Sequence, residues 1–202
     1  MNVMADPIVF YLEFSSPYAY VAAQEIDELA ERYGRQVLWR PVSLGHVWKA
    51  IGYDPAAMPR QKRRYMAGDM IRSARLAGLP FTMPETFPVN ARLARLVFYR
   101  LNARDADLAR RFALAVLNRY WGQGQDITTA DDLAGIAAGL RIDTGEIEAA
   151  ASDEAAKAAV IEATEAAVND GCFGMPWFML DGEAFWGHDR LGQIEKRLQE
   201  TA

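Results

Sequence analysis

The sequence predicts an α/β protein in which strands near both ends of the chain flank a long helical segment. Residues 8–14, Ile-Val-Phe-Tyr-Leu-Glu-Phe, are apolar and rich in strand-forming side chains. Ser16-Pro17 follows and opens an amphipathic helix. Far downstream, Pro176 stands immediately before a second apolar segment that begins at Trp177. A strand, a polar residue at the next helix N-terminus and a distant X-Pro before another strand are together the layout of a thioredoxin-like fold.

The first unit of the chain reads as strand, helix and strand. Apolar side chains recur at helical spacing through residues 17–33, and Gly34 provides a stop. Ser16 suits the N-cap, and Pro17 suits the first helical turn, where its missing N–H costs nothing. Residues 36–43 predict a second strand. This spacing predicts a right-handed unit with two parallel strands.

The middle of the chain, about residues 45–168, is helical in pattern, with several apolar stripes at helical spacing. Thr129 with Asp132 resembles a capping box at the start of one of these helices. An alanine-rich segment over residues 153–168 predicts a further helix.

The C-terminal region returns to strands. Residues 177–180 and 183–186 flank the dipeptide Asp181-Gly182, which is typical of a tight β-hairpin. A last helix is expected at about residues 189–200.

The whole chain therefore reads βαβ, helical insertion, ββα. Its 202 residues are enough for one substantial core. We expect residues 6–44 plus 170–202 to form one thioredoxin-like domain, split by an all-helical insertion at residues 45–169.

Composition bounds the possible partners. The chain is 51% apolar and 24% charged, as a folded globular protein is. Its net charge of -5 gives no reason to expect nucleic acid or an anionic membrane surface as partner. The basic run at residues 60–64 fits a solvated helix face better than an anion site. With no apolar run of the ~18 residues that a membrane span needs and no secretory signal pattern, we expect a cytoplasmic protein.

Cysteine and histidine content excludes two kinds of site. The single cysteine, Cys172, cannot form an intramolecular pair, so a dithiol oxidoreductase is excluded. Cys172 most resembles a small buried apolar residue. Two histidines without a cysteine cluster leave no credible zinc site, and we predict no bound metal.

Ser16 is the central candidate for chemistry. The simpler interpretation is a helix N-cap alone, because a serine hydroxyl is a poor nucleophile without a base. A hydroxyl at a helix N-terminus can instead donate a hydrogen bond to a bound thiolate. The partial positive charge and free N–H groups of that helix end favour the same anion. The chemistry that fits is the activation of a thiol that the protein does not itself supply.

Pro176 is the second candidate. A proline beside a strand commonly marks only a strand edge. A cis Met175-Pro176 bond would instead present the backbone N–H and C=O of Met175 beside Ser16, where an extended peptide can pair with them as an added strand. Glutathione is such a peptide and carries the required thiol, so we predict glutathione as the cofactor.

Seven stretches of the sequence match one known family in order over nearly the full length. They are FSSPYAY (14–20), RPVSLG (40–45), VWKAIG (47–52), residues 62–72 with Tyr65 and Asp69 inside, FPVN (87–90), GCFGMP (171–176) and WGHDRL (186–191). Each alone is a weak signal, whereas their combination is fairly specific. On these stretches the chain resembles the 2-hydroxychromene-2-carboxylate isomerases, relatives of kappa-class glutathione transferases in the DsbA-like group of thioredoxin folds.

The resemblance implies a glutathione site. Ser16 would be the catalytic residue that holds the glutathione sulfur, and Met175 would pair with the tripeptide backbone. His188 with Asp189 would receive the γ-glutamyl end. The remaining positions of this cofactor-binding set are Pro17, Tyr18 and Pro176. From the residues alone, Asp189 equally suits the cap of the final helix.

The resemblance also implies a site for a small aromatic carboxylate, with Lys49 and Asn90 near it. Tyr53 belongs to the same set, and it departs from the family pattern, in which asparagine is expected. From the residues alone, Lys49 fits a surface lysine and Asn90 fits an N-cap for the helix that follows.

Three functions are compatible with these residues. The first, implied by the resemblance, is a glutathione-dependent isomerase of aromatic catabolism, of the naphthalene-degradation type. It would act as in the conversion of 2-hydroxychromene-2-carboxylate to trans-o-hydroxybenzylidenepyruvate. The second is a kappa-like glutathione transferase or peroxidase. The third is a thioredoxin-fold module that binds peptides without catalysis. The resemblance further implies a homodimer.

Overall fold

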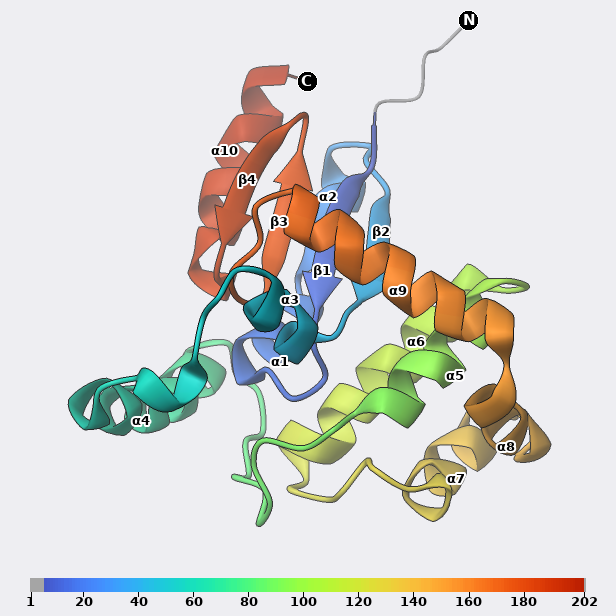
Figure 1. Cartoon of the computed structure of the whole chain (residues 1–202). Coiled ribbons are helices and arrows are strands. Elements are labelled where there is room, and N and C mark those ends of the chain that lie inside the picture. Colours follow the sequence, from blue (N-terminus) through green and yellow to red (C-terminus); the bar gives the residue numbers. More distant parts are fainter. Residues whose placement is uncertain (1–5, 202) are drawn as a thin grey trace, which may run out of the picture.

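The computed structural model describes residues 6–201 and shows a four-stranded mixed sheet with helices on both faces (Figure 1). The strand order is β2-β1-β3-β4. Strand β1 (Ile8–Leu12) is parallel to β2 (Val37–Pro41) and antiparallel to β3 (Trp177–Leu180), which pairs with β4 (Glu183–Trp186). The sheet confirms the predicted α/β, thioredoxin-like fold class.

Aromatic side chains hold the centre of the sheet. Phe10 on β1 lies opposite Trp39 on β2 and Phe178 on β3. The Phe10 ring is stacked on Phe178 at 5.1 Å and meets Trp39 edge-on at 5.0 Å. Because successive strand residues point to opposite faces, Tyr11 lies on the other face, in a cluster with Trp177.

The helix predicted over residues 17–33 is interrupted. The structure has α1 (Pro17–Ala23) and α2 (Ile26–Arg32), separated by Gln24 and Glu25. At the break, the N–H groups of these two residues bond to carbonyls three positions back, both at 3.2 Å. The tighter turn changes the direction of the chain, so that α1 buries nearly all of its residues and α2 only one face.

Two α-helices and one short 3-10 helix follow β2. Helix α3 (Leu44–Ala50) packs against α9, and the short helix η1 (Pro55–Ala57) leads to α4 (Arg60–Leu76). Helix α4 extends away from the sheet in Figure 1 and contacts α1.

The rest of the insertion is a helical layer. It contains α5 (Arg92–Asn102), α6 (Ala106–Leu117), the π-helical turn η2 (Asn118–Gly122), α7 (Ala130–Gly139) and α8 (Gly145–Ser152). The capping box at Thr129 and Asp132 is confirmed, since each side chain accepts a bond from the other residue's N–H. Trp121 is fully buried, and its indole N–H donates to the Phe14 carbonyl at 3.0 Å. The insertion thus supports the segment that leads to Ser16.

Helix α9 (Glu154–Asn169) returns the chain across one face of the sheet, and α10 (Leu191–Thr201) follows β4 (Figure 1). The turn between β3 and β4 has positive φ at Asp181 (50°) and Gly182 (82°), as the predicted hairpin requires. Because α9 contacts both β2 and α3, the insertion and the sheet share a core, and the two-domain division at residues 45 and 169 stays a prediction. None of the helices described in residues 6–201 is long and apolar enough to cross a membrane.

Candidate active site

Ser16 lies at the end of a tight turn that leaves β1. Its backbone N–H donates to the Glu13 carbonyl at 2.9 Å, and its side-chain oxygen accepts the Ala19 N–H at 3.2 Å. The first helical residue is Pro17. The predicted N-cap is therefore present, and Ser16 is only 7% exposed. A buried hydroxyl thus lies at the electropositive end of α1.

The Met175-Pro176 peptide bond is cis and lies directly beside this cap. The Ser16 hydroxyl donates to the Met175 carbonyl at 3.1 Å, across 159 residues of sequence. The Pro176 carbonyl in turn accepts the Gly187 N–H at 3.0 Å, which ties the loop to the end of β4. Helix cap and proline loop therefore form one local unit, as the layout of the sequence predicts.

Tyr18, His188 and Asp69 form a second group next to Ser16. The ring of Tyr18 is stacked on that of His188, with centroids 5.1 Å apart, and the Tyr18 hydroxyl donates to Asp69 at 2.9 Å. Burial lowers the pKa of His188, so its imidazole is mainly neutral at neutral pH. Burial opposes ionisation of Asp69, but hydrogen bonds from Tyr18 and Arg72 outweigh it and lower the pKa of this carboxyl. The group therefore offers one fixed anion and one neutral ring.

Asp189 lies two residues before the first residue of the final helix, and so not at its N-cap position. His188–Arg190 form a single 3-10 turn, and α10 begins only at Leu191. The Asp189 carboxylate is exposed and pairs with Arg190 at 3.1 Å. This carboxylate is therefore open to a ligand as well as to solvent.

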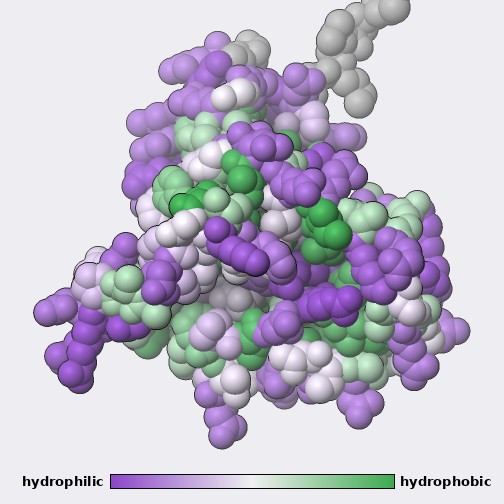
Figure 2. Space-filling view, viewed as in Figure 1, coloured by the Kyte–Doolittle hydropathy of each residue, from purple (hydrophilic) through white to green (hydrophobic). Residues whose placement is uncertain are grey.

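The proposed substrate residues on and after α3 lie at the surface. Lys49 is exposed, and Tyr53 is 39% exposed with its ring 5.4 Å from that of Trp48. The Trp48 indole N–H donates to the Phe173 carbonyl at 3.0 Å, which joins α3 to the loop before Met175. A shallow depression of about 370 Å³ lies beside Tyr53, and its wall also includes Met58, Pro59 and Lys62. On this side of the molecule, apolar surface occurs as small patches among polar side chains (Figure 2).

Asn90 lies just before α5 and is held from two sides. Its side-chain oxygen accepts the Arg92 N–H at 3.1 Å and a guanidinium N–H of Arg95 at 3.3 Å. The expectation that Asn90 is the N-cap of this helix is wrong, because α5 begins at Arg92 and its N-cap is Ala91, without a side-chain cap bond. Among the described residues, neither Asn90 nor Lys49 forms a hydrogen bond with Ser16. The structure thus joins Ser16 to Met175 and Tyr18 to His188 directly, whereas no contact links Lys49, Tyr53 or Asn90 to these four among the described residues.

Two features of the site were missed by the sequence interpretation. Asp69 was noted only inside a matching stretch, and the buried pair Glu13–Arg95 was not noted at all. Nη1 of Arg95 lies 2.8 and 2.7 Å from the two carboxylate oxygens of Glu13. A charged residue at the end of an otherwise apolar strand was the available signal, because glutamate is rarely buried without a partner.

Cys172 takes no part in this arrangement. It is fully buried and its thiol lies 3.4 Å from the Gly174 carbonyl, as expected for a small core residue. Burial raises the pKa of Cys172 to about 12.

We therefore expect the Cys172 thiol of the native protein to react with a thiol reagent at neutral pH at least ~100-fold more slowly than that of the unfolded chain, because the thiolate is the reactive form. Absorbance-monitored titration with and without guanidinium measures this, and equal rates would contradict it.

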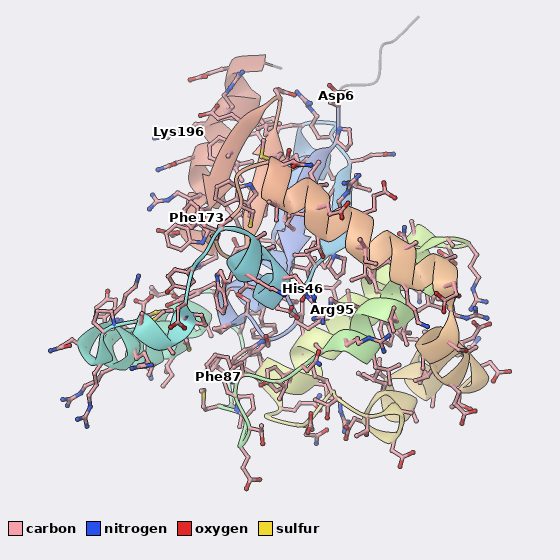
Figure 3. All side chains as sticks on the ribbon, viewed as in Figure 1. Asp6, His46, Phe87, Arg95, Phe173 and Lys196 are labelled. Atoms are coloured by element: carbon pink, nitrogen blue, oxygen red, sulfur yellow. The ribbon has the colours of Figure 1, made fainter. Side chains whose placement is uncertain are left out.

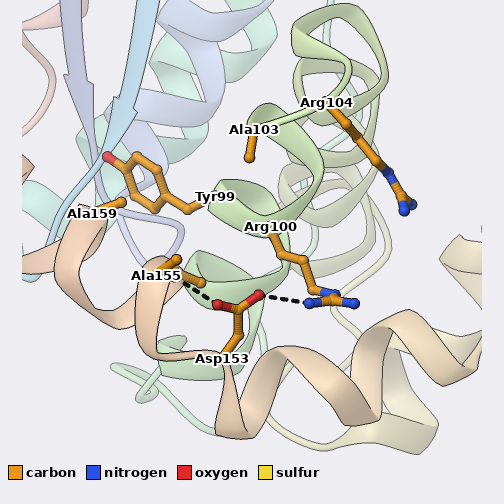
Figure 4. A pocket seen from close by; sticks show the side chains of 8 residues that line it. Tyr99, Arg100, Ala103, Arg104, Asp153, Ala155 and Ala159 are labelled. Atoms are coloured by element: carbon orange, nitrogen blue, oxygen red, sulfur yellow. Dashed lines mark hydrogen bonds and ion pairs between the residues drawn. The ribbon is translucent and has the colours of Figure 1, made fainter.

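A separate cavity of about 290 Å³ lies between α5 and α9, remote in sequence from the Ser16 turn. Figure 4 shows Tyr99, Arg100 and Asp153 around it. Arg100 binds Asp153 and Glu146, both at 2.6 Å, and Arg104 also binds Glu146. The two arginines beside this cavity are therefore paired with two carboxylates.

This ion network predicts a pH dependence of stability. Hydrogen bonds from Arg104 and Arg100 hold the pKa of Glu146 below its usual value. A lowered carboxyl pKa contributes stability that is fully present above the unfolded-state value, about 4.3, and is lost as the pH falls below it through the folded-state pKa. Arg100→Gln should therefore lose less stability than the wild type on acidification through this range. Urea unfolding at a series of pH values measures the difference, and identical pH profiles would contradict it.

Metal ligands are not gathered anywhere in residues 6–201, where no group of three or more His, Cys, Asp or Glu could hold an ion. The chain as a whole is similar to known proteins. The family model described as a DSBA-like thioredoxin domain matches residues 7–199. The 2-hydroxychromene-2-carboxylate isomerase of Sphingobium xenophagum is 30% identical over 199 residues, which are 96% of this chain and 99% of that protein. The chain belongs to the 2-hydroxychromene-2-carboxylate isomerase family.

A solved structure of a 2-hydroxychromene-2-carboxylate isomerase agrees with this assignment. It has a TM-score of 0.85 and 30% identity, and the match covers 96% of this chain and 95% of that one. Glutathione S-transferase kappa 1 of Caenorhabditis elegans is 27% identical to this chain, and the match covers 96% of this chain and 91% of the transferase. The protein is thus an enzyme of the isomerase kind, with kappa-class transferases as further relatives.

Proposed function

We propose that this member of the isomerase family is a glutathione-dependent isomerase of an aromatic-ring catabolite. The reaction would resemble the conversion of 2-hydroxychromene-2-carboxylate to trans-o-hydroxybenzylidenepyruvate. The observation that carries the proposal is the 3.1 Å bond from the Ser16 hydroxyl to the Met175 carbonyl. It supports a site in which the helix cap and the peptide-pairing loop act on one ligand.

The residues at the site fit a thiol tripeptide. The Ser16 hydroxyl can donate one hydrogen bond, which it now donates to the Met175 carbonyl. Rotation about the Cβ–Oγ bond would allow it to donate to a sulfur anion instead. The start of α1 contributes its electropositive end, and Met175 contributes backbone groups for an extended peptide. His188 and Asp189 would receive the γ-glutamyl end, where the Asp189 carboxylate suits an α-ammonium group. Pro17, Tyr18 and Pro176 would shape the same site.

Glutathione, when bound, supplies a thiolate that adds to a conjugated carbon and is later eliminated. Ser16 would keep that sulfur ionised by a hydrogen bond. Lys49 would pair with the substrate carboxylate, and Asn90 and Tyr53 would contact the aromatic part. Tyr53, in place of an amide, offers a ring face on which a flat substrate can stack.

Turnover tests the proposal. With 2-hydroxychromene-2-carboxylate, the purified protein should isomerise substrate only when glutathione is added, and the glutathione concentration should stay constant.

The similarity to kappa-class transferases supports a second candidate function, that of a glutathione transferase or peroxidase. A conjugation assay with a halogenated aromatic separates the two, because net loss of glutathione excludes a purely catalytic thiol.

We further propose a cytoplasmic homodimer built on one thioredoxin-like domain with a helical insertion. Sedimentation of the purified protein tests the dimer, and fractionation of cells tests the compartment. Limited proteolysis tests the domain division, since a separate insertion would be released intact.

A further inference from the structure

The buried ion pair Glu13–Arg95 lies next to the Ser16 turn. A gain in folding stability does not by itself explain why two charges are buried there. Glu13 is 5% exposed and Arg95 is 6% exposed. Taking two charges out of water costs free energy that their attraction barely offsets, and an apolar pair of similar volume is often at least as stable. A pair kept at this position therefore calls for a second reason.

The contacts of the pair supply that reason. The Glu13 carbonyl accepts the Ser16 N–H at 2.9 Å, so the acid is part of the same turn as the cap. Its carboxylate also accepts the N–H of Leu44, the first residue of α3, at 3.3 Å. The second guanidinium nitrogen of Arg95 donates to the Asn90 side chain at 3.3 Å. One ion pair thus connects the Ser16 turn, α3 and the segment before α5.

We propose that Arg95 is a positioning residue that, anchored by Glu13, holds the Asn90 side chain at a set distance from the Ser16 turn. The inference rests on the proposed function, in which Asn90 contacts the aromatic substrate. Arg95 belongs to α5, and Figure 3 labels it close to His46 of α3 in this view. Asn90 itself is exposed, and among the described residues the Arg92 N–H is the one other hydrogen-bond partner that orients its side chain.

The chemistry of arginine explains why this residue type is needed. Its planar guanidinium presents donors in a rigid fork, so one nitrogen binds the Glu13 carboxylate while the other reaches Asn90. The Nε atom is buried and has no partner among the described residues, so the hold depends on these two nitrogens. A lysine at this position keeps the charge but not the fixed pair of directions.

A double-mutant cycle tests the inference. We expect Arg95→Lys and Asn90→Ala each to lower kcat/KM for 2-hydroxychromene-2-carboxylate by roughly 10- to 100-fold, the size of effect that a small misplacement of a contact produces. The combined variant should be no slower than the slower single variant, because both changes remove the same contact. Affinity for glutathione should not change. Losses that multiply in the combined variant would overturn the inference.

The matched control is Arg100→Lys, on the same helix. Arg100 forms an ion pair with Glu146 and Asp153 and touches none of the proposed site, so its variant should keep the wild-type kcat/KM. If Arg95→Lys does not fold, the double variant Glu13→Leu/Arg95→Met takes the place of Arg95→Lys in the cycle. It removes both buried charges together and leaves neither without its partner.

A structural readout separates this inference from the proposed function. If the wild type shows no turnover, the proposed function fails, but the side-chain amide of Asn90 can still be followed by NMR. We expect its two amide resonances to move toward those of a freely rotating exposed asparagine in Arg95→Lys and to stay unchanged in Arg100→Lys. Asn90 resonances that are the same in the wild type and Arg95→Lys would overturn the positioning role.

Discussion

Ser16→Ala is expected to lower kcat/KM of the glutathione-dependent isomerisation by about 100- to 1000-fold, the usual cost of removing one preorganised donor to a developing or bound anion. The hydroxyl is buried at the tip of α1 and lies 3.1 Å from the Met175 carbonyl. Its loss should also raise the pKa of the bound glutathione thiol. Steady-state kinetics and the ultraviolet absorbance of the thiolate as a function of pH measure the two effects.

Ser15→Ala provides the control for this variant. Ser15 lies in the same turn but forms no part of the helix cap, so this change should leave kcat/KM near the wild-type value. Ser16→Ala also removes the N-cap, which costs about 0.5–2 kcal/mol of folding stability, so unfolding curves should accompany the kinetics. A folded Ser16→Ala protein with full activity and an unshifted thiol pKa would refute the role of Ser16.

Arg95→Ala is expected to reduce the free energy of unfolding by about 3–5 kcal/mol, because it leaves the Glu13 carboxylate buried without its partner. The pair is among the few buried charged groups of the described structure. Guanidinium unfolding, in which the midpoint shifts while the slope stays constant, measures the loss. Arg100→Ala is the comparison, since a partly exposed ion pair contributes only about 0–1 kcal/mol.

The loss in Arg95→Ala should depend on pH. Burial raises the pKa of Glu13, and the charge of Arg95 opposes that rise in the wild type. Without Arg95 the folded state would retain a proton on Glu13 that the unfolded chain has released, so stability falls as the pH rises above the unfolded-state value, about 4.3. The variant should therefore be less destabilised at pH 5 than at pH 8. A loss that does not change with pH would show that Glu13 is not the group left unpaired.

Much of the fold could be predicted from local signals. The N-cap at Ser16, the capping box at Thr129 and the hairpin turn at Asp181 each depend on a few neighbouring residues, whose turn and cap chemistry is the same in any fold. The break between α1 and α2 could not be predicted, because the apolar spacing continues through it. In the structure α1 contacts α4, α6, η2 and η3, and none of these contacts can be inferred from the local pattern.

The site divides in the same way. Ser16, Met175 and Pro176 could be selected from the sequence because a helix cap and an X-Pro before a strand are local features. The stacking of Tyr18 on His188, the bond of Tyr18 to Asp69 and the pair Glu13–Arg95 could not. Each joins residues that are tens of positions or more apart, and no spacing rule relates them.

Periodicity and cap residues were thus enough to predict the α/β class and the serine at the start of α1, and the seven matching stretches were enough to predict the isomerase family. Which distant side chains lie beside the start of α1, and which buried ion pair lies next to the Ser16 turn, became known only from the folded chain. Hydrogen bonds and ion pairs depend on separations of a few ångströms between atoms. Only the packing of the sheet, α3 and α5 establishes those separations.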